Sequence, residues 1–228
     1  MIGCSHALTF VWRRLTSRTG KAILMHDSIE RARNELMSVG RWMSAQSFLP
    51  ATSGNLSCRV SATHVAITAS GCDKGALSAA DVVLVEIDEV DEPGVRRTSA
   101  ELPLHLQLYR DRPATGAVLH GHSVASTLVS ASHLHEARIV FSGYEILKAF
   151  RGVTSHTASV EVPIFANDQD MAAVSAAVSE RLARLPEATC YLLAGHGAYA
   201  WGDSVGEARR HLEALEFLLR CQLEGGRR

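Results

Sequence analysis

The sequence predicts an α/β protein in which helices flank a central sheet, giving three α/β/α layers. Short apolar segments separated by Gly/Ser-rich turns dominate the middle of the chain and indicate strands. Segments with capping signals and helical spacing stand before, between and after them. A chain of 228 residues, 46% of them apolar, can bury one full core. We therefore expect one layered domain.

The N-terminal part predicts a tail followed by a helix. Within residues 1–24 the apolar stretch from Ala7 to Trp12 is too short for a signal-peptide core or a spanning helix. We expect either a poorly ordered tail or an upstream start codon with the functional start near Met25. Asp27 to Glu30 has capping-box spacing and should begin a helix that continues to about Met43. The folded domain would then span residues 25–228.

Strands and further helices follow in order. The predicted strands are Leu56–Val60 paired as a hairpin with His64–Thr68, then Val82–Ile87, the segment around His120, an edge strand at Val160–Ile164, Tyr191–His196 and Ala198–Trp201. The predicted helices open at Ser99, after Ser123, at Tyr144, after Asp170 and at Ser204. Charged residues with Pro93 and Gly94 predict an exposed turn.

Charge and cysteine content exclude several classes of partner. A net charge of −1 and a pI near 6.8 provide no basic field for nucleic acid or an anionic membrane. Five cysteines at wide spacings, an odd number without a Cys-x-x-Cys pair, indicate reduced thiols in a cytosolic protein. We expect a cytoplasmic protein with a small-molecule ligand.

Two histidines one residue apart, His120 and His122, are the strongest sign of chemistry. Side chains at i and i+2 of a strand point the same way, so both imidazoles can coordinate one cation. A lone histidine is more often a packed core residue, but a pair on one strand face would crowd unless an electron acceptor lay between them. His196 stands between two glycines, which allow a ligand to approach closely. Three His ligands with an open fourth position form a catalytic zinc arrangement.

Several motifs resemble the class II aldolase/adducin family over about residues 26–222. They are Ser53–Ser57, Thr68–Gly71, Ser99–Glu101, His120–Ser123 and Gly195–Gly197. Longer segments are similar to one branch of this family, the dehydratases of methionine salvage. They are Ala51–Ser57, Ser70–Gly75, Gly143–Phe150, Val162–Asp170 and His211–Leu218. Two positions depart from the pattern, because Cys72 replaces a larger or charged residue and Gly121 a bulkier one.

The resemblance implies a class II aldolase-like domain with a mainly antiparallel sheet. It also implies one zinc per subunit on His120, His122 and His196, in a homo-oligomer, with a homotetramer as the expected form and sites near subunit boundaries. The implied reaction removes water from 5-methylthioribulose 1-phosphate and gives a 2,3-diketone. Removing a proton next to a ketone builds negative charge on oxygen, which a Lewis acid stabilises.

Water must also leave from C4, which requires a general acid. Glu145 matches the acid/base position of the dehydratase branch, and Glu101 matches the base of the aldolase members, so Glu145 ranks first and Glu101 second. Without the resemblance, Glu145 reads as a solvated residue in the first turn of a helix, whereas for Glu101 that reading and a role in the site are equally favoured.

The substrate phosphate needs donors, which two loops offer as backbone N–H groups and hydroxyls. The candidates are Ser53, Gly54, Asn55, Ser70 and Gly71, with Lys74 as the charge. Taken alone, such loops are ordinary hairpin turns.

Two other functions stay open. One is a sugar-phosphate aldolase or epimerase of the same family. The other is a metal-free interaction module like the adducin head, against which the retained histidines and glutamates count.

Overall fold

The computed structural model describes residues 6–88 and 98–225, and side chains from residue 23 onward. The expected turn at Pro93 and Gly94 lies outside these residues. Within the described ranges, eight strands form one sheet in the order β3-β2-β1-β4-β8-β7-β6-β5. They are β1 Asn55–Arg59, β2 His64–Thr68, β3 Val82–Glu86, β4 Ala117–Gly121, β5 Arg138–Phe141, β6 Val160–Phe165, β7 Cys190–Leu193 and β8 Gly197–Gly202.

The sheet is mainly antiparallel, as the resemblance implies. The predicted hairpin is present, with Cys58 of β1 opposite Ala66 of β2. Of the seven neighbouring pairs in the described sheet, β6 with β7 is the parallel one, and it pairs Ile164 with Leu192. A parallel pair needs a crossover, and helix α4 (Met171–Ala183) makes it.

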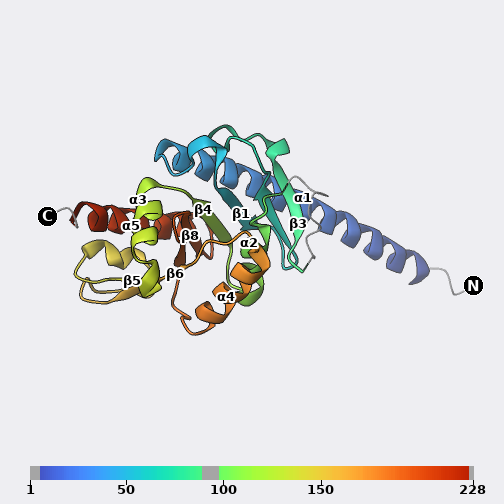
Figure 1. Ribbon diagram of the computed structural model, residues 1–228. Coiled ribbons are helices and arrows are strands. Elements are labelled where there is room, and N and C mark those ends of the chain that lie inside the picture. The colour runs from blue at the N-terminus through green and yellow to red at the C-terminus, as the bar shows by residue number, and fades with distance from the viewer. Residues whose placement is uncertain (1–5, 89–97, 226–228) are drawn as a thin grey trace, which may run out of the picture.

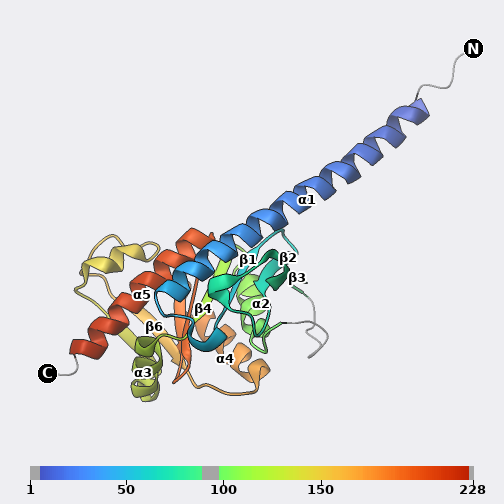
Figure 2. The same ribbon diagram turned by 90° about the horizontal axis from the view of Figure 1, so that it is seen from above.

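Helices cover both faces of the sheet, so the predicted three layers are confirmed. Helices α1 (His6–Ala45) and α5 (Val205–Gly225) lie on one face with α3 (Val124–Ser132) beside α5, and α2 (Leu102–Asp111) and α4 lie on the other (Figures 1 and 2). Among the described helices, none combines the length and apolarity needed to cross a membrane.

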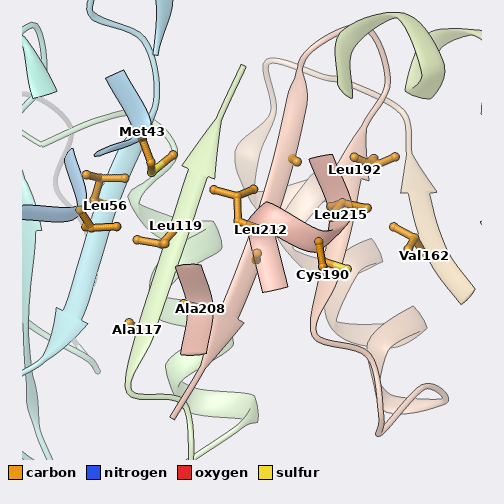
Figure 3. Packing of buried hydrophobic residues seen from close by; sticks show 14 of the residues in the cluster. Met43, Leu56, Ala117, Leu119, Val162, Cys190, Leu192, Ala208, Leu212 and Leu215 are labelled. Carbon is orange, nitrogen blue, oxygen red and sulfur yellow. The ribbon is translucent and has the colours of Figure 1, made fainter. Parts of the chain in front are cut away.

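Alternation along the central strands divides the core into two clusters. On β4, Ala117 and Leu119 pack toward α1 and α5, whereas Val118 packs toward α2 and α4. Figure 3 shows the first cluster. Met43 of α1 lies near Leu56 and Leu119, and Leu212 and Leu215 of α5 lie over the strands beyond β4 in the sheet. Burial on both faces fixes the register, because a slip by one residue would exchange the two faces.

Helix α1 begins earlier than the sequence indicates. The capping box at residues 27–30 does not start a helix, because α1 runs continuously from His6. No proline interrupts the chain before Pro50, so a helix formed by the buried turns extends in the N-terminal direction. The N-terminal part projects away from the body (Figure 2). Residues 6–24 are therefore helical here, and the boundary near residue 25 stays a prediction.

Two further predictions are wrong in detail. Strand β6 is not an edge strand, because it lies between β5 and β7. The edge strand on this side of the sheet is β5, a short strand that was not predicted and whose residues alternate between exposed and buried. Helix α2 opens after Glu101 rather than at Ser99, with Pro103 in its first turn, where a missing N–H costs nothing.

Capping elsewhere is confirmed. The Ser123 hydroxyl accepts a hydrogen bond from the Ser126 N–H at the start of α3, and the Asp170 carboxylate accepts from the N–H groups of Ala172 and Ala173 at the start of α4. The short helix near Tyr144 is a 3-10 helix, Glu145–Ala149.

Candidate metal centre and substrate pocket

The order of the central strands brings the three predicted histidines to one edge of the sheet. Antiparallel pairing places the start of β1 beside the end of β4, with Asn55 opposite His120, and the turn between β7 and β8 reaches the same edge. His120 lies at the end of β4, and its ring stacks on Tyr199 of β8 at 3.9 Å. His122 follows the strand directly, and its N–H donates to the Phe48 carbonyl at 2.7 Å.

Glycines on both sides of the histidines allow this approach. Gly195 has φ +66, and a Cβ on Gly197 would collide with the Gly121 carbonyl and contact the His120 ring. A Cβ on Gly121 would lie 2.9 Å from the Phe48 carbonyl. Glycine at position 121, a departure from the family pattern, therefore fits the close packing of the Phe48 segment.

The three imidazoles converge together with one carboxylate. Ring centroids of His120, His122 and His196 lie 4.5 to 5.0 Å apart. Glu101 Oε1 lies 3.0 Å from His196 Nε2 and 3.5 Å from His120 Nε2. One ligand atom from each of the four residues lies within 4.8 Å of the others, so this group could hold a metal ion.

Hydrogen bonds elsewhere turn lone pairs toward the centre of the group. His120 Nδ1 donates to the Ala198 carbonyl at 2.9 Å, and His196 Nδ1 donates to Asn167 Oδ1 at 3.1 Å. In the neutral tautomer that this bonding selects, each ring presents an unprotonated Nε2 toward the carboxylate and toward His122 Nε2, which lies 2.8 Å from His120 Nε2. Several acceptors facing one point repel each other unless a cation lies between them, so the residues fit a divalent metal.

The charges of the group agree with this assignment. In the metal-free chain, burial opposes ionisation of Glu101, but His120 and His196, through the charge and hydrogen bonds of their protonated forms, hold its pKa well below its usual range. Burial, reinforced by the neighbouring imidazoles, lowers the pKa of His122 to about 3. An ionised carboxylate and neutral imidazoles are the protonation states that bind metals.

A pocket of about 330 Å³ adjoins the four residues and is lined by His122 and Glu101 on that side. All six predicted phosphate-binding residues line it: Ser53, Gly54, Asn55, Ser70, Gly71 and Lys74. Lys74 is buried, and its Nζ donates to the Thr52 carbonyl at 2.6 Å. Burial lowers the Lys74 pKa, while Cys72, Asp73 and Glu101 oppose that shift. The six residues that the resemblance suggested therefore lie in one contiguous pocket.

The loop that forms one wall of this pocket is strained. Ala51 and Thr52 have φ of 51 and 66, in the left-handed region that non-glycine residues rarely adopt, and Gly54 follows with φ 75. Such conformations cost on the order of 1–3 kcal/mol each and gather at functional sites. Nothing in the sequence of Ala51-Thr52 predicts this conformation.

The structure does not bring Glu145 to the group. Its exposed carboxylate pairs with Lys148 Nζ at 2.5 Å and lies 3.8 Å from His156 Nδ1, and it is absent from the pocket lining. Glu101, ranked second as acid/base, is the glutamate that lies among the histidines. Its expected place in the first turn of a helix at Ser99 is wrong, because the segment before α2 turns its side chain inward.

Two supporting residues were missed. Asn167 orients His196, although the sequence indicated only a helix cap in that segment, and Tyr199 stacks on His120 from the neighbouring strand. The alternation of Tyr191, Tyr199 and Trp201 in adjacent strands was the available signal for an aromatic face beneath His120.

This fold and site define a class. Residues 34–223 match the family model described as Class II Aldolase and Adducin N-terminal domain, and the chain belongs to that family. Among the relatives is the methylthioribulose-1-phosphate dehydratase of Acidiphilium cryptum, 48% identical over 194 residues that cover 85% of this chain and 90% of the relative. The protein of the same name from Gluconobacter oxydans is 45% identical, covering 86% and 93%.

Solved structures agree on the fold. The L-fuculose-1-phosphate aldolase of Thermus thermophilus superimposes with a TM-score of 0.68 at 25% identity, covering 85% of this chain and 93% of the other. YgbL of Klebsiella pneumoniae gives 0.71 at 24% identity, covering 88% and 92%.

Proposed function

We propose that this protein is a zinc-dependent dehydratase that converts 5-methylthioribulose 1-phosphate to 2,3-diketo-5-methylthiopentyl 1-phosphate and water in methionine salvage. The observation that carries the proposal is the convergence of Glu101 with three histidines beside the pocket of Lys74. Relatives of that name at 44 to 48% identity support the substrate. Free, buried thiols at Cys58 and Cys190 support a cytoplasmic location.

His120, His122, His196 and Glu101 would hold one divalent ion per subunit. When bound, that ion supplies Lewis acidity for the negative charge that develops on substrate oxygens. The Lys74 ammonium and the loops at 53–55 and 70–71 would bind the phosphate. A carboxylate takes the C3 proton, the C4–O bond breaks, and the departing hydroxide receives a proton to leave as water. The resulting enol becomes the C3 ketone when a proton returns to C4.

We propose that Glu145 performs this proton transfer from a neighbouring subunit of a homotetramer. Its carboxylate points to solvent, away from the pocket of its own chain. Lys148 holds the pKa of Glu145 below its ordinary value in the single chain, whereas a general acid needs a raised pKa. Burial at a subunit contact would supply that shift. Exposed Val124 and Leu128, one turn apart on α3, support such a contact.

A second candidate is a sugar-phosphate aldolase with Glu101 as its base. The observation in its favour is the position of Glu101 between the histidines and the pocket.

One assay separates these candidates. The purified protein is incubated with 5-methylthioribulose 1-phosphate, with and without chelator, and the diketone is followed by absorbance and mass. We expect chelator-sensitive production. Glu145→Gln should lower the rate by about 10²-fold or more, as loss of an acid/base group does, while Glu101→Gln keeps much of it at saturating zinc.

Glu136→Gln, an exposed change outside the pocket lining, is the matched control for lost charge. Loss of the reaction in Glu101→Gln with activity retained in Glu145→Gln would support the aldolase-type base. A reaction that ignores chelator, or no diketone at all, would overturn the proposal.

A further inference from the structure

A row of buried polar side chains leads from the core to Glu101. Asn55 and Ser57 are two residues apart on β1, and His105 and Tyr109 are one turn apart on α2. Both spacings place each pair on one face, so the strand pair and the helix pair meet between the layers. All four residues are at most 3% exposed.

The hydrogen bonds of this row run in one direction. An ionised carboxylate only accepts, so the Asn55 Nδ2 group donates to Glu101 Oε2, at 2.5 Å. Asn55 Oδ1 therefore faces inward and accepts from His105 Nε2–H. His105 Nδ1 must then accept from the Ser57 hydroxyl at 2.7 Å, and Ser57 Oγ accepts from the Tyr109 hydroxyl at 2.9 Å.

His105 is held in the neutral state that this row requires. Burial lowers the pKa of His105 to about 3, a protonated His120 would lower it in the same direction, and the charge of Glu101 opposes that shift only in part. A protonated ring would donate from both nitrogens and would collide with the Ser57 hydroxyl hydrogen. The neutral ring instead accepts on one side and donates on the other.

We propose that His105 is a positioning residue that, through Asn55, fixes the Glu101 carboxylate against the three histidines and thereby strengthens metal binding. The inference rests on the proposed metal site. It also gives Asn55 a role different from phosphate recognition, because its amide hydrogens are directed to Glu101 and, at 3.3 Å, to the Ser99 hydroxyl. Partners behind metal ligands typically change affinity by about 10- to 100-fold.

The alternative is that this row of polar side chains only stabilises the core. Two substitutions of His105, each of which keeps the hydrogen bond of one ring nitrogen, distinguish this alternative from a role in metal binding. In His105→Gln the amide nitrogen takes the place of Nε2 and can still donate to Asn55. In His105→Asn the amide oxygen takes the place of Nδ1 and can still accept from Ser57, but the contact with Asn55 is lost. Both variants are neutral, and each leaves one half of the row intact.

The test measures binding of Co²⁺ alone through its visible absorption, with thermal unfolding recorded for each metal-free variant. We expect His105→Asn to weaken Co²⁺ affinity by about 10-fold or more and His105→Gln by clearly less. In a Glu101→Ala background, His105→Asn should have no further effect, because its influence passes through that carboxylate.

Equal affinities in the two single variants, or an undiminished effect of His105→Asn without Glu101, would overturn the inference. If His105→Asn does not fold, Asn55→Ala breaks the same row one bond closer to Glu101 and should also weaken Co²⁺ binding about 10-fold. Unchanged affinity in Asn55→Ala would equally count against it. Failure of the wild-type chain to bind Co²⁺ would refute the metal site itself, which is a separate outcome.

Discussion

At the scale of single residues, the pocket contains two glycines with the same backbone conformation and different surroundings. Gly54 has φ +75, and a Cβ there would collide with Leu49 and lie 2.6 Å from the His120 carbonyl. Gly71 has φ +73, but a Cβ there would meet nothing within 4 Å. The first position needs glycine for conformation and for space, and the second needs it for conformation alone.

Alanine at each position should therefore have different costs. Gly71→Ala should lose about 1–2 kcal/mol of unfolding free energy, the cost of a left-handed residue with a Cβ. Gly54→Ala should lose about 3 kcal/mol or more, because backbone next to a metal-binding histidine must also move. Urea unfolding of both variants measures the difference, and equal losses would contradict it.

At the scale of elements, a buried carboxyl joins α5 to the start of α3. Ser123, which caps α3 directly after His122, donates to Glu216 Oε2 at 2.5 Å, and the other Glu216 oxygen is buried without a hydrogen-bond partner among the described residues. Burial raises the pKa of Glu216 to about 7, although the hydroxyls of Ser123 and Ser126 favour ionisation. The contact between the two helices is thus sensitive to pH.

The sign of this dependence follows from the raised pKa. Between pH 4.5 and 7 the folded protein binds the Glu216 proton and the unfolded chain releases it, so stability falls as pH rises through this range. Relative to Glu216→Gln, the wild type should lose on the order of 3 kcal/mol between pH 4 and 8. Urea unfolding across this range measures it, and Glu213→Gln, exposed on the same helix, is the control. Parallel curves for wild type and Glu216→Gln would disprove the assignment.

At the scale of the whole molecule, the core begins well inside α1. Ala32, Leu36, Val39 and Met43 are buried at intervals of three and four residues, whereas Ile23 and Leu24 are 55% and 67% exposed. This periodic stripe is what holds α1 on the sheet. The part of α1 before this stripe therefore contributes little to the free energy of unfolding.

A chain that starts at Met25 should consequently keep the fold. We expect its unfolding free energy to remain within about 0.5 kcal/mol of the full chain, as for changes outside a core. Leu36→Ala, within the stripe, should cost about 2–5 kcal/mol. Denaturant unfolding of both proteins provides the comparison, and a truncation as costly as Leu36→Ala would move the domain boundary toward the N-terminus.

Features encoded within a few neighbouring residues could be predicted from the sequence alone. The spacing of His120 and His122, the cap at Ser123 and the hairpin at β1 and β2 each depend on local periodicity or capping, and the structure contains all of them. The limits of α1, the edge strand β5 and the start of α2 escaped prediction, because tertiary packing and strand order set them. The resemblance identified the pocket loops, which their composition alone does not distinguish from ordinary turns.

Which glutamate joins the histidines within one chain depends on packing between distant segments. Glu101 and Glu145 both stand near a helix start in the sequence. The strand order β1-β4-β8-β7 brings His120 and His196 together, and Glu101, directly before α2, lies against them while Glu145 remains exposed. Burial by the same packing keeps His105 neutral, so that its ring accepts a hydrogen bond on one side and donates one on the other, and it raises the pKa of Glu216. Burial and distant partners set these properties, and a local pattern of residues contains neither.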